Sequence, residues 1–598
     1  MNILGISCYY HDSAAALLQD GVLIAAAEEE RFSRKKHDSD YPEQAIQFCL
    51  DRAGITGQDL DYVVFYEKPL LKFERILLSS LGYFPKTMAF FREAMVSWFD
   101  TKLWIKSRLQ TEIGIPTNKI LFVEHHLSHA ASAMFSSPFE DAAVLTIDGV
   151  GEWTTASLGH ATATFDGSGT NSINLSKEIR FPHSLGLLYS TFTAYLGFRV
   201  NNGEYKVMGM APYGQPTYMD LMDKIVSVDE AGGVQLNMDY FSFHYSLKGA
   251  FNDQFVKLFG TPRTPEADFY TKTTNPKKDF PGWSDSIAEQ NQKYANIAAT
   301  IQRFTEETIL KMVQAAHKET GSKNLVMAGG VALNSVANGR IIREGPFEDV
   351  FIQPAAGDSG GALGAALYAY HVLLGQPRKF VMEHAYWGAE YDDAEMAEAI
   401  KESGFAYEQI TDQEKLLDQV TDTIMDERVI GWYHNRFEWG PRALGNRSIL
   451  ADPRSEAMKE VVNTKIKFRE PFRPFAPVTL AEEAANYFST KNIETNKLAP
   501  YMLMVSPIVE DKQDKIQAVC HNGTGRLQSV QQSVNPAYYR LIQKFGEATG
   551  VPVLLNTSFN LRGEPIVNTP QNALNTFAKS DIDQLVMGSF LVKKGDRE

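Results

Sequence analysis

Short apolar runs separated by polar turns open the chain. Residues 2–7 form one such run, and two more, 14–18 and 22–27, flank Gln19-Asp20-Gly21. Since Asp-Gly accepts the positive φ angles of a tight turn, this pattern predicts a strand, the polar turn 9–13 and then a β-hairpin.

A helix is predicted next, over residues 42–53. Asp40 is the expected cap, Pro42 lies in the first turn, Glu43 completes a capping box, and Gly54 ends the helix. Its apolar positions follow the helical spacing i, i+3, i+4, i+7, at Ile46, Cys49, Leu50 and Ala53.

The strand–turn–strand pattern returns at residues 143–147, 148–151 and 154–158. Each copy has an aspartate in its turn, Asp12 in the first and Asp148 in the second. We therefore expect a duplicated lobe, with a ligand held in the cleft between the copies.

Two later predicted strands, 325–328 and 350–353, end in the Gly-rich sequences AGGVALN and GDSGGALGAA. Neither matches a P-loop or a GxGxxG fingerprint. Backbone N–H groups at such turns can meet an anion, so we predict a nucleotide site with Gly329, Gly330 and Asn334. The alternative is that these small residues only permit close packing.

Glu204 and Lys206 lie in the sequence NGEYKVMGMAPYG. They either line the nucleotide or acceptor pocket or belong to a tight structural turn, and the sequence leaves both readings open.

The domain division predicted from the sequence is a first domain over 1–375, a linker over 376–390 and a second α/β domain over 391–598, with strands near 429–432, 551–555 and 584–592. Residues 70–112 and 215–290 are rich in aromatic side chains. We expect them to be helical or loop insertions that wall a substrate pocket.

Composition narrows the function. The chain has 598 residues, a length that favours several domains. Its net charge of −15 excludes a broad polycationic surface for binding nucleic acid. Its 3 cysteines are too few and too scattered for a disulfide framework. With no apolar stretch long enough to span a membrane, the expected location is cytoplasmic.

HHLSHA places His125 and His129 four residues apart, on one face of a helix. With the carboxylates of Asp148 and Asp358, they suit a divalent ion of the iron, manganese or zinc type better than calcium. A surface histidine pair is the alternative.

The sequences HNRFEWGPRALGNRSILADPR and KIKFREPFRPF concentrate positive charge in an acidic chain. Apolar residues interrupt the charges, which favours a phosphate site over a solvated face. The basic side chains are Arg436, Arg442, Arg447, Arg454, Lys467, Arg469 and Arg473. Asn556, Ser558 and Asn560, just past a predicted strand, can add polar contacts.

His11, in the opening polar turn, is a candidate general base. The alternative is a buried histidine that only makes structural hydrogen bonds.

Nine segments stand in this order along the chain: GISCYYHDSAAAL, EHHLSHAASA, LTIDGVGEWTT, YKVMGMAPYG, AGGVALN, GDSGGALGAA, WGPRALGNRSILADPR, KFREPFRPFAP and NTSFNLRGEPIV. Together they resemble the natural-product O-carbamoyltransferases, a family that includes the tobramycin, cephamycin and nodulation-factor enzymes and also acts on alkaloids of the saxitoxin type. The resemblance implies an α/β chain with a two-lobed actin/Hsp70-like ATPase fold, similar to the tRNA threonylcarbamoyl transferase domain, followed by a YrdC-like domain.

The resemblance also implies two reactions. Carbamoyl phosphate and ATP, with Mg²⁺ possible, give carbamoyl adenylate in the second domain. The carbamoyl group then passes to the hydroxyl of a small natural product in the first. By the same resemblance, His11 takes the acceptor's proton and Asp12 orients acceptor or base.

Further roles implied by the resemblance concern ligands. His125, His129, Asp148 and Asp358 would hold Fe²⁺. Carbamoyl phosphate and ATP would contact Arg442, Arg447, Lys467, Arg469, Asn556 and Ser558.

Three rival functions remain at this point: a tRNA threonylcarbamoyladenosine-type modification enzyme, a sugar-kinase-like phosphotransferase and an inactive metal- or nucleotide-binding regulator. The net charge of −15 argues against the first, which needs a tRNA surface. The expected partners are a small hydroxyl acceptor and a second copy in a homodimer, with no nucleic acid and no membrane.

Overall fold

The computed structural model describes residues 1–100, 102–167, 169–246, 249–274, 283–470 and 472–594. The chain forms two compact units. The first unit comprises residues 1–24, 39–42 and 49–381, and the second comprises 25–38, 43–48 and 382–598. The boundaries predicted from the sequence stay a prediction.

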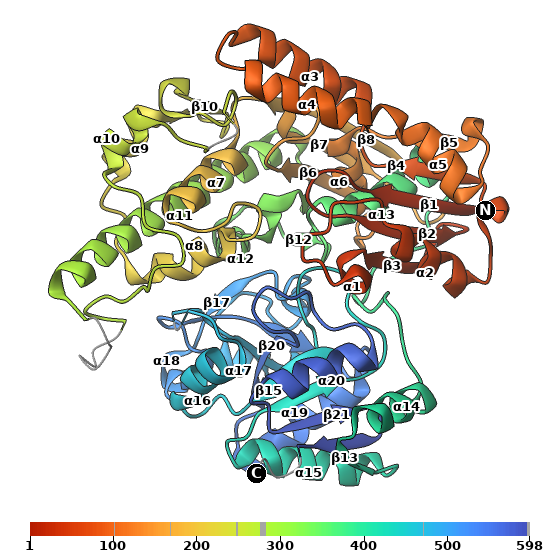
Figure 1. Cartoon of the computed structure of the whole chain (residues 1–598), viewed down its shortest axis with the longest axis vertical. Coiled ribbons are helices and arrows are strands. Elements are labelled where there is room, and N and C mark those ends of the chain that lie inside the picture. The colour runs from red at the N-terminus through yellow and green to blue at the C-terminus, as the bar shows by residue number, and fades with distance from the viewer. Residues whose placement is uncertain (101, 168, 247–248, 275–282, 471, 595–598) are drawn as a thin grey trace. The chain divides into compact units, whose positions relative to one another are not determined.

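Two five-stranded sheets build the first unit (Figure 1). One has the order β3-β2-β1-β4-β5 and the other β12-β11-β6-β7-β8. The bounds are β1 Asn2–Ser7, β2 Ala14–Gln19, β3 Val22–Glu28, β4 Tyr62–Phe65, β5 Ile120–Phe122, β6 Asp141–Ile147, β7 Thr154–Thr162, β8 Ser172–Arg180, β11 Asn324–Ala328 and β12 Asp349–Ile352.

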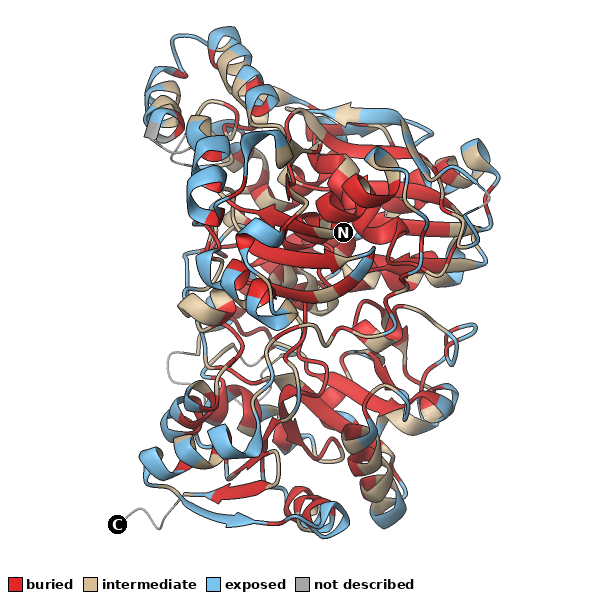
Figure 2. Ribbon diagram, turned by 90° about the vertical axis from the view of Figure 1, so that its right-hand side faces the viewer, coloured by how far each residue is buried: buried red, intermediate tan, exposed pale blue. Residues whose placement is uncertain are grey.

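The two sheets have the same topology. β1 is antiparallel to β2 and parallel to β4, which is parallel to β5. In the same way, β6 is antiparallel to β7 and parallel to β11, which is parallel to β12. Counted from β1 and from β6, both orders read 3-2-1-4-5, so the predicted duplication is confirmed. β1 and β6 are buried along almost their whole length, which explains their continuous apolar sequences. Buried strands are red in Figure 2, whereas β8 is largely exposed.

The helix that follows each set of strands packs on the other sheet. α6 (His125–Met134) comes after β5 but lies against β6, β7 and β11, whereas α13 (Asp358–Tyr368) comes after β12 but lies against β1, β2 and β4. The two helices also pack on each other. Because α13 is enclosed on all sides from Asp358 to Leu367, it carries almost no polar side chain beyond its first turn.

Glycines make these crossings possible. A Cβ on Gly364 of α13 would lie 1.8 Å from the carbonyl oxygen of Ser128 in α6. A Cβ on Gly5 of β1 would lie 1.9 Å from the carbonyl oxygen of Ala362. In α13, therefore, the small residues serve close packing, which is one of the two readings of GDSGGALGAA.

The remaining helices of the first unit flank these layers. They are α3 Pro69–Gly82, α4 Met88–Asp100, α5 Ile105–Ile113, α7 Leu185–Tyr195, α8 Glu204–Met210, α9 Met219–Ile225, α10 Asp253–Phe259, α11 Asp285–Thr320 and α12 Ser335–Glu344. The described residues of 70–112, predicted to be helical or loop, are thus mainly helical, and their role as a wall of a substrate pocket stays a prediction. Within 215–290 the helices are accompanied by a short hairpin, β9 (Val226–Val228) with β10 (Val234–Leu236).

An eight-stranded mixed sheet forms the second unit, in the order β13-β22-β21-β14-β15-β20-β16-β19, and a two-stranded sheet pairs β17 with β18. Its strands are β13 Ala406–Gln409, β14 Ile430–Tyr433, β15 Arg447–Ala451, β16 Ala476–Leu480, β17 Val505–Pro507, β18 Thr524–Arg526, β19 Gln528–Val530, β20 Val553–Ser558, β21 Gln584–Met587 and β22 Phe590–Lys593. Its helices are α1 Glu30–Ser33, α14 Asp393–Ser403, α15 Gln413–Met425, α16 Ala457–Glu460, α17 Ala484–Tyr487, α18 Glu510–Gln513, α19 Pro536–Thr549 and α20 Pro570–Lys579.

The predicted last strand, 584–592, is wrong in one respect. It is a hairpin of β21 and β22, because Gly588 has a φ of +55° and reverses the chain.

The predicted cap of α2 (Glu43–Ala53) is also wrong. Pro42 occupies the cap position and no side chain caps locally. Instead, Glu29 accepts the N–H of Gln44 at 3.2 Å and that of Ala45 at 2.7 Å. A carboxylate from the preceding segment satisfies the free N–H groups of the first turn, a long-range contact that the pattern around Asp40 does not reveal.

Among the described residues, no helix has both the length and the apolar character needed to cross a membrane.

Gly364→Ala should lower the free energy of unfolding by about 1–3 kcal/mol, because its Cβ would force α6 and α13 apart. Urea unfolding of the full chain measures this. The matched control is Gly82→Ala in α3, where a Cβ meets nothing within 4 Å. The control should be neutral or stabilising by up to about 1 kcal/mol. Equal stability of the two variants would contradict the packing argument.

Candidate functional site

Four buried side chains meet where α6, the turn after β6 and the start of α13 come together. The Nε2 atom of His125 lies 3.0 Å from Nε2 of His129, 3.1 Å from Oδ2 of Asp148 and 3.5 Å from Oδ1 of Asp358. Nε2 of His129 lies 3.8 Å from the same Asp148 oxygen and 3.6 Å from that of Asp358. The structure thus brings all four predicted metal ligands together.

The unsatisfied atoms of this group fit a cation. Both carboxylate oxygens of Asp358 are buried and make no hydrogen bond. Two neutral imidazole nitrogens 3.0 Å apart repel through their lone pairs unless a proton or a cation lies between them. Burial alone would lower the pKa of His129, but the neighbouring carboxylates of Asp148 and Asp358 raise it to about 9. Two imidazoles with two carboxylates form a donor set suited to a divalent transition metal.

His126 points away from this group, as the sequence predicts. Its Nδ1 lies 2.6 Å from Oγ1 of Thr146 and its Nε2 lies 2.9 Å from the carbonyl oxygen of Thr154. Burial, together with His125 and His129, keeps its pKa well below the ordinary value, so the ring is neutral. His126 therefore anchors α6 to β6 and β7.

The turn after β11 supports Asp148. The N–H of Gly330 donates to Oδ1 of Asp148 at 2.9 Å. Gly329 has a φ of +94°, and a Cβ there would lie 2.2 Å from the carbonyl oxygen of Ile147. These glycines let the ends of β11 and β6 approach each other, and their nucleotide-binding role stays a prediction.

The other predicted nucleotide residues make structural contacts. Oδ1 of Asn334 caps α12 through the N–H of Ala337, and its amide exchanges hydrogen bonds of 3.1 and 3.2 Å with Gln302. Glu204 accepts a 3.0 Å hydrogen bond from Ser190. Lys206 lies over the ring of Phe198. No nucleotide contact can be assigned from these positions, so that role also stays a prediction.

His11 and Asp12 form an ion pair in the turn after β1. Nδ1 of His11 lies 2.8 Å from Oδ2 of Asp12. Burial alone would lower the pKa of His11, but Asp12, Asp358 and Asp148 raise it to about 10. Asp148 and Asp358, the two carboxylates of the group that they form with His125 and His129 (the His/Asp group), thus act on the ring of His11.

In the second unit, Lys467 is buried within a ring of oxygen atoms. Its Nζ donates to the carbonyl oxygens of Ser558 at 2.7 Å and Asn560 at 2.8 Å, and to Oδ1 of Asn560 at 2.6 Å. Burial, then Arg469, Arg473 and Lys36, lower its pKa well below the ordinary value. Lys467, Arg469 and Ser558 thus belong to one basic and polar cluster.

Arg447 lies apart from that cluster in its contacts. Its guanidinium is fully buried, stacks 3.7 Å from the ring centre of Tyr433, and donates to the carbonyl oxygens of His434 and Asn446. The N–H groups of Arg447 thus bind backbone carbonyl oxygens, and a ligand role for Arg447 stays a prediction. Arg469 also has an acceptor within the protein, since its Nε donates to the side-chain Oδ1 of Asn463 at 2.6 Å.

The loop that carries Arg442 is folded around a buried carboxylate. Oε1 of Glu438 accepts the N–H groups of Leu444, Asn446 and Arg447 at 2.8, 2.8 and 3.1 Å. Asn556 reaches the same loop, donating to the carbonyl oxygen of Ala443 at 3.3 Å. Arg442, half-exposed, is therefore presented by a rigid loop.

Two models of one protein family together match most of the chain. The N-terminal model of the carbamoyltransferases matches residues 2–367, and the C-terminal model matches residues 421–594. The chain belongs to the carbamoyltransferase family. It is therefore a transferase enzyme.

Three relatives are similar to the chain over almost all of its residues. Over nearly its whole length, this carbamoyltransferase is 44% identical to the uncharacterized protein sll1178 of Synechocystis, with 99% of this chain and 97% of the relative covered. Nodulation protein NolNO of Sinorhizobium fredii is 37% identical, with 98% of this chain and 79% of NolNO covered. The 3'-hydroxymethylcephem-O-carbamoyltransferase of Amycolatopsis lactamdurans is 27% identical, with 97% and 96% covered.

The inner face of α3 in this carbamoyltransferase holds charges that the sequence analysis missed. Lys72 and Arg75 are buried, whereas Leu70 and Leu81 of the same helix are 72% and 63% exposed. Lys72 pairs with buried Glu67 at 2.6 Å, and its ammonium lies over the ring of Tyr10, next to His11. The signal was available in PLLKFERILL, where charges interrupt a leucine-rich helix.

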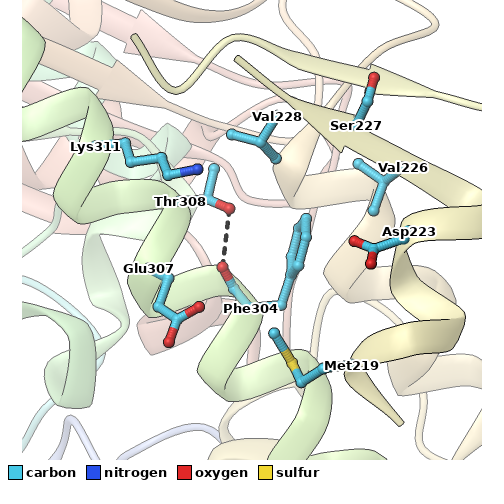
Figure 3. Close-up of a pocket in the computed structure, with 9 residues that line it drawn as sticks. All are labelled: Met219, Asp223, Val226, Ser227, Val228, Phe304, Glu307, Thr308 and Lys311. Carbon is cyan, nitrogen blue, oxygen red and sulfur yellow. Dashed lines mark hydrogen bonds between the residues drawn. The ribbon is translucent and has the colours of Figure 1, made fainter. Parts of the chain in front are cut away.

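A cavity of about 410 Å³ lies between α9, β9 and α11 (Figure 3). Residues of the predicted insertion 215–290 do line it, among them Met219, Asp223 and Val226. None of the predicted site residues does. We assign it no role.

Removing one donor should abolish metal uptake. Wild-type protein is expected to retain about one divalent ion per chain, measured by elemental analysis after dialysis, whereas His129→Ala and Asp358→Asn should retain almost none, because a divalent ion needs most of this buried donor set. The control is His160→Ala, whose ring pairs with Asp141 on the surface. Metal content unaffected by either site variant would show that the group is not a metal site.

Proposed function

We propose that this carbamoyltransferase uses carbamoyl phosphate and ATP to form carbamoyl adenylate in its second unit and transfers the carbamoyl group to an alcohol in its first unit. The observation that carries this proposal is the presence of two separate polar centres, the His/Asp group with His11 in the first unit and the Lys467 cluster in the second. Each lies within the part of the chain matched by one family model. The actin-like fold of the first unit, supported by its duplicated 3-2-1-4-5 sheets, and the YrdC-like fold of the second are part of the proposal.

In the second unit, carbamoyl phosphate would lose inorganic phosphate to water. The carbamate oxygen would then attack the α-phosphorus of ATP, forming carbamoyl adenylate while pyrophosphate leaves. Both substrates carry several negative charges, which Lys467, Arg469 and Arg442 would balance together with Asn556 and Ser558. Mg²⁺ can accompany ATP.

In the first unit, the acceptor hydroxyl would attack the carbamoyl carbon, and AMP would leave. The neutral imidazole of His11 would take the hydroxyl proton, and Asp12, at 2.8 Å from its Nδ1, would stabilise the imidazolium that forms. A divalent cation held by Asp148 and Asp358 would favour that neutral form, because it offsets negative charge that raises the pKa of His11. Lys72, whose ammonium lies over the ring of Tyr10, and Arg75 are buried charged side chains of this unit, and the charge of Lys72 is balanced by Glu67.

His125, His129, Asp148 and Asp358 would hold a divalent ion, with Fe²⁺ as the proposed metal. When bound, it supplies Lewis-acid stabilisation of the charge that develops on the departing phosphate. Gly330 fixes the position of Asp148 by its 2.9 Å hydrogen bond, and His126 and Thr146 fix α6.

The proposed acceptor is the hydroxyl of a small secondary metabolite. The net charge of −15 argues against a nucleic-acid partner. The name of the Amycolatopsis relative describes carbamoyl transfer to a hydroxymethyl group on a small ring system. A homodimer, a cytoplasmic location and the absence of a membrane partner complete the proposal.

The products of turnover test the proposed function. Incubation with carbamoyl phosphate, ATP and a panel of candidate alcohols should yield AMP and pyrophosphate, with both requiring carbamoyl phosphate. Release of ADP without carbamoyl phosphate, or modification of tRNA with threonine and bicarbonate, would refute it.

His11→Asn should separate the two reactions. Carbamoyl transfer should fall by about 10²–10⁴-fold, because a general base is lost. Pyrophosphate release from ATP and carbamoyl phosphate should not change, since the second unit is intact. Quantification of carbamoylated product and pyrophosphate in the same reaction measures both. His160→Ala is the control, and transfer at the wild-type rate in His11→Asn would exclude His11 as the base.

A further inference from the structure

An N-terminal segment belongs structurally to the second unit. Residues 25–38 and 43–48 pack with residues 382–598, although more than three hundred residues separate them in sequence. The segment contains the charged sequence EEERFSRKK, none of whose residues has been assigned to a site above. Three of its charged side chains form hydrogen bonds with two loops of the second unit.

The first contact is a clasp around the peptide groups of Gly440. Oε1 of Glu28 accepts the N–H of Gly440 at 2.8 Å, and Nη2 of Arg31 donates to its carbonyl oxygen at 2.6 Å. Glu28 and Arg31 are 6% and 1% exposed, and the guanidinium also lies over the ring of Phe437. Charge-assisted hydrogen bonds in a dry environment hold a backbone group firmly.

This clasp acts two residues before Arg442. Gly440 has a φ of +104°, a conformation open to glycine, and Pro441 restricts φ at the next position. The direction of the chain at Gly440 therefore sets where the backbone of Arg442 lies. Glu438 fixes the other end of the loop through Leu444, Asn446 and Arg447.

The second contact is a fork from Arg34. Its Nη1 donates to the carbonyl oxygen of Ile566 at 2.7 Å, and its Nη2 to that of Pro565 at 2.8 Å. The adjacent carbonyl oxygen of Glu564 accepts from Nδ2 of Asn560 at 2.6 Å. Asn560 in turn holds Lys467. One arginine thus stabilises the loop that surrounds the buried lysine.

We propose that Glu28, Arg31 and Arg34 are positioning residues for the adenylation site of the second unit: the Glu28–Arg31 clasp sets Arg442, and the Arg34 fork sets the loop that holds Lys467. This inference rests on the proposed function for the identity of the ligands, but not for the anchoring of the two loops. None of the three residues has to touch substrate.

Two conservative variants test the inference in the full-length protein. Since Arg31→Met would leave Glu28 as a buried unpaired charge and endanger folding, the variants are Arg31→Lys and Arg34→Lys, which keep the charge but lose the forked geometry. Lys35→Ala is the control from the same segment, because its ammonium lies on the surface beside Asp38.

Hydrogen exchange without ligands gives the first readout. Arg31→Lys should speed exchange of the amides in 438–447, and Arg34→Lys should speed it in 559–567, each leaving the other loop and the thermal midpoint nearly unchanged. The control should alter neither. Unchanged exchange in both variants, or a uniform increase across the second unit with a lowered thermal midpoint, would overturn the inference.

Kinetics give the second readout. In both variants, kcat/KM for pyrophosphate release should fall by about 10- to 100-fold. The reason is that Arg442 or Lys467 is displaced and no longer aligned with the substrates. Transfer from supplied carbamoyl adenylate should stay at the wild-type rate. Equal losses in both reactions would overturn the positioning role. If the wild-type protein itself releases no pyrophosphate, the proposed function fails, while the exchange result still decides whether the segment anchors the two loops.

Discussion

The contact between α6 and α13 is the constraint on which the first unit depends. Each helix lies against the sheet of the opposite repeat, so the pair joins the two lobes at their centre. At Gly364 the backbones approach so closely that a Cβ would lie 1.8 Å from the carbonyl oxygen of Ser128. Because His125 and His129 belong to α6 and Asp358 begins α13, this spacing also sets the distances within the His/Asp group. The close spacing of α6 and α13 therefore determines both the packing of the two lobes and the geometry of the His/Asp group.

Charge in the second unit serves mainly as scaffold. Arg447, Arg31 and Arg34 direct their guanidinium groups to backbone carbonyl oxygens, and Glu438 and Glu28 accept backbone N–H groups. Loops without regular structure leave backbone N–H and C=O groups unpaired, and burying those groups unpaired is costly. The charged side chains provide the missing hydrogen-bond partners and make the loops rigid. The dense run of arginines in this acidic chain thus has a structural cause besides any role in binding phosphate.

Local pattern predicted what local physics determines. The strands of the duplicated lobes, the helix that carries His125 and His129, and the end of α2 at Gly54 all follow from nearby residues, and the structure has them. The His/Asp group was found because i, i+4 spacing and strand ends fix directions in space. The cap of α2 by Glu29 and the buried Lys72–Glu67 pair depend on distant partners. The family roles of the arginines came from resemblance, and spacing alone could not separate Arg447, which holds backbone, from Arg442.

The second unit is not a continuous piece of the chain, and this follows from where its buried charges find their partners. The family model of the C-terminus begins at residue 421. A fragment cut there would lack Arg31 and Arg34, and the carbonyl oxygens of Gly440, Pro565 and Ile566 would lose their charged donors. Water would have to replace these charge-assisted hydrogen bonds, which are stronger than neutral ones, and the loops would lose the side chains that anchor them. Residues 25–38, which begin within β3, are therefore as much a part of the second unit as its own sheet.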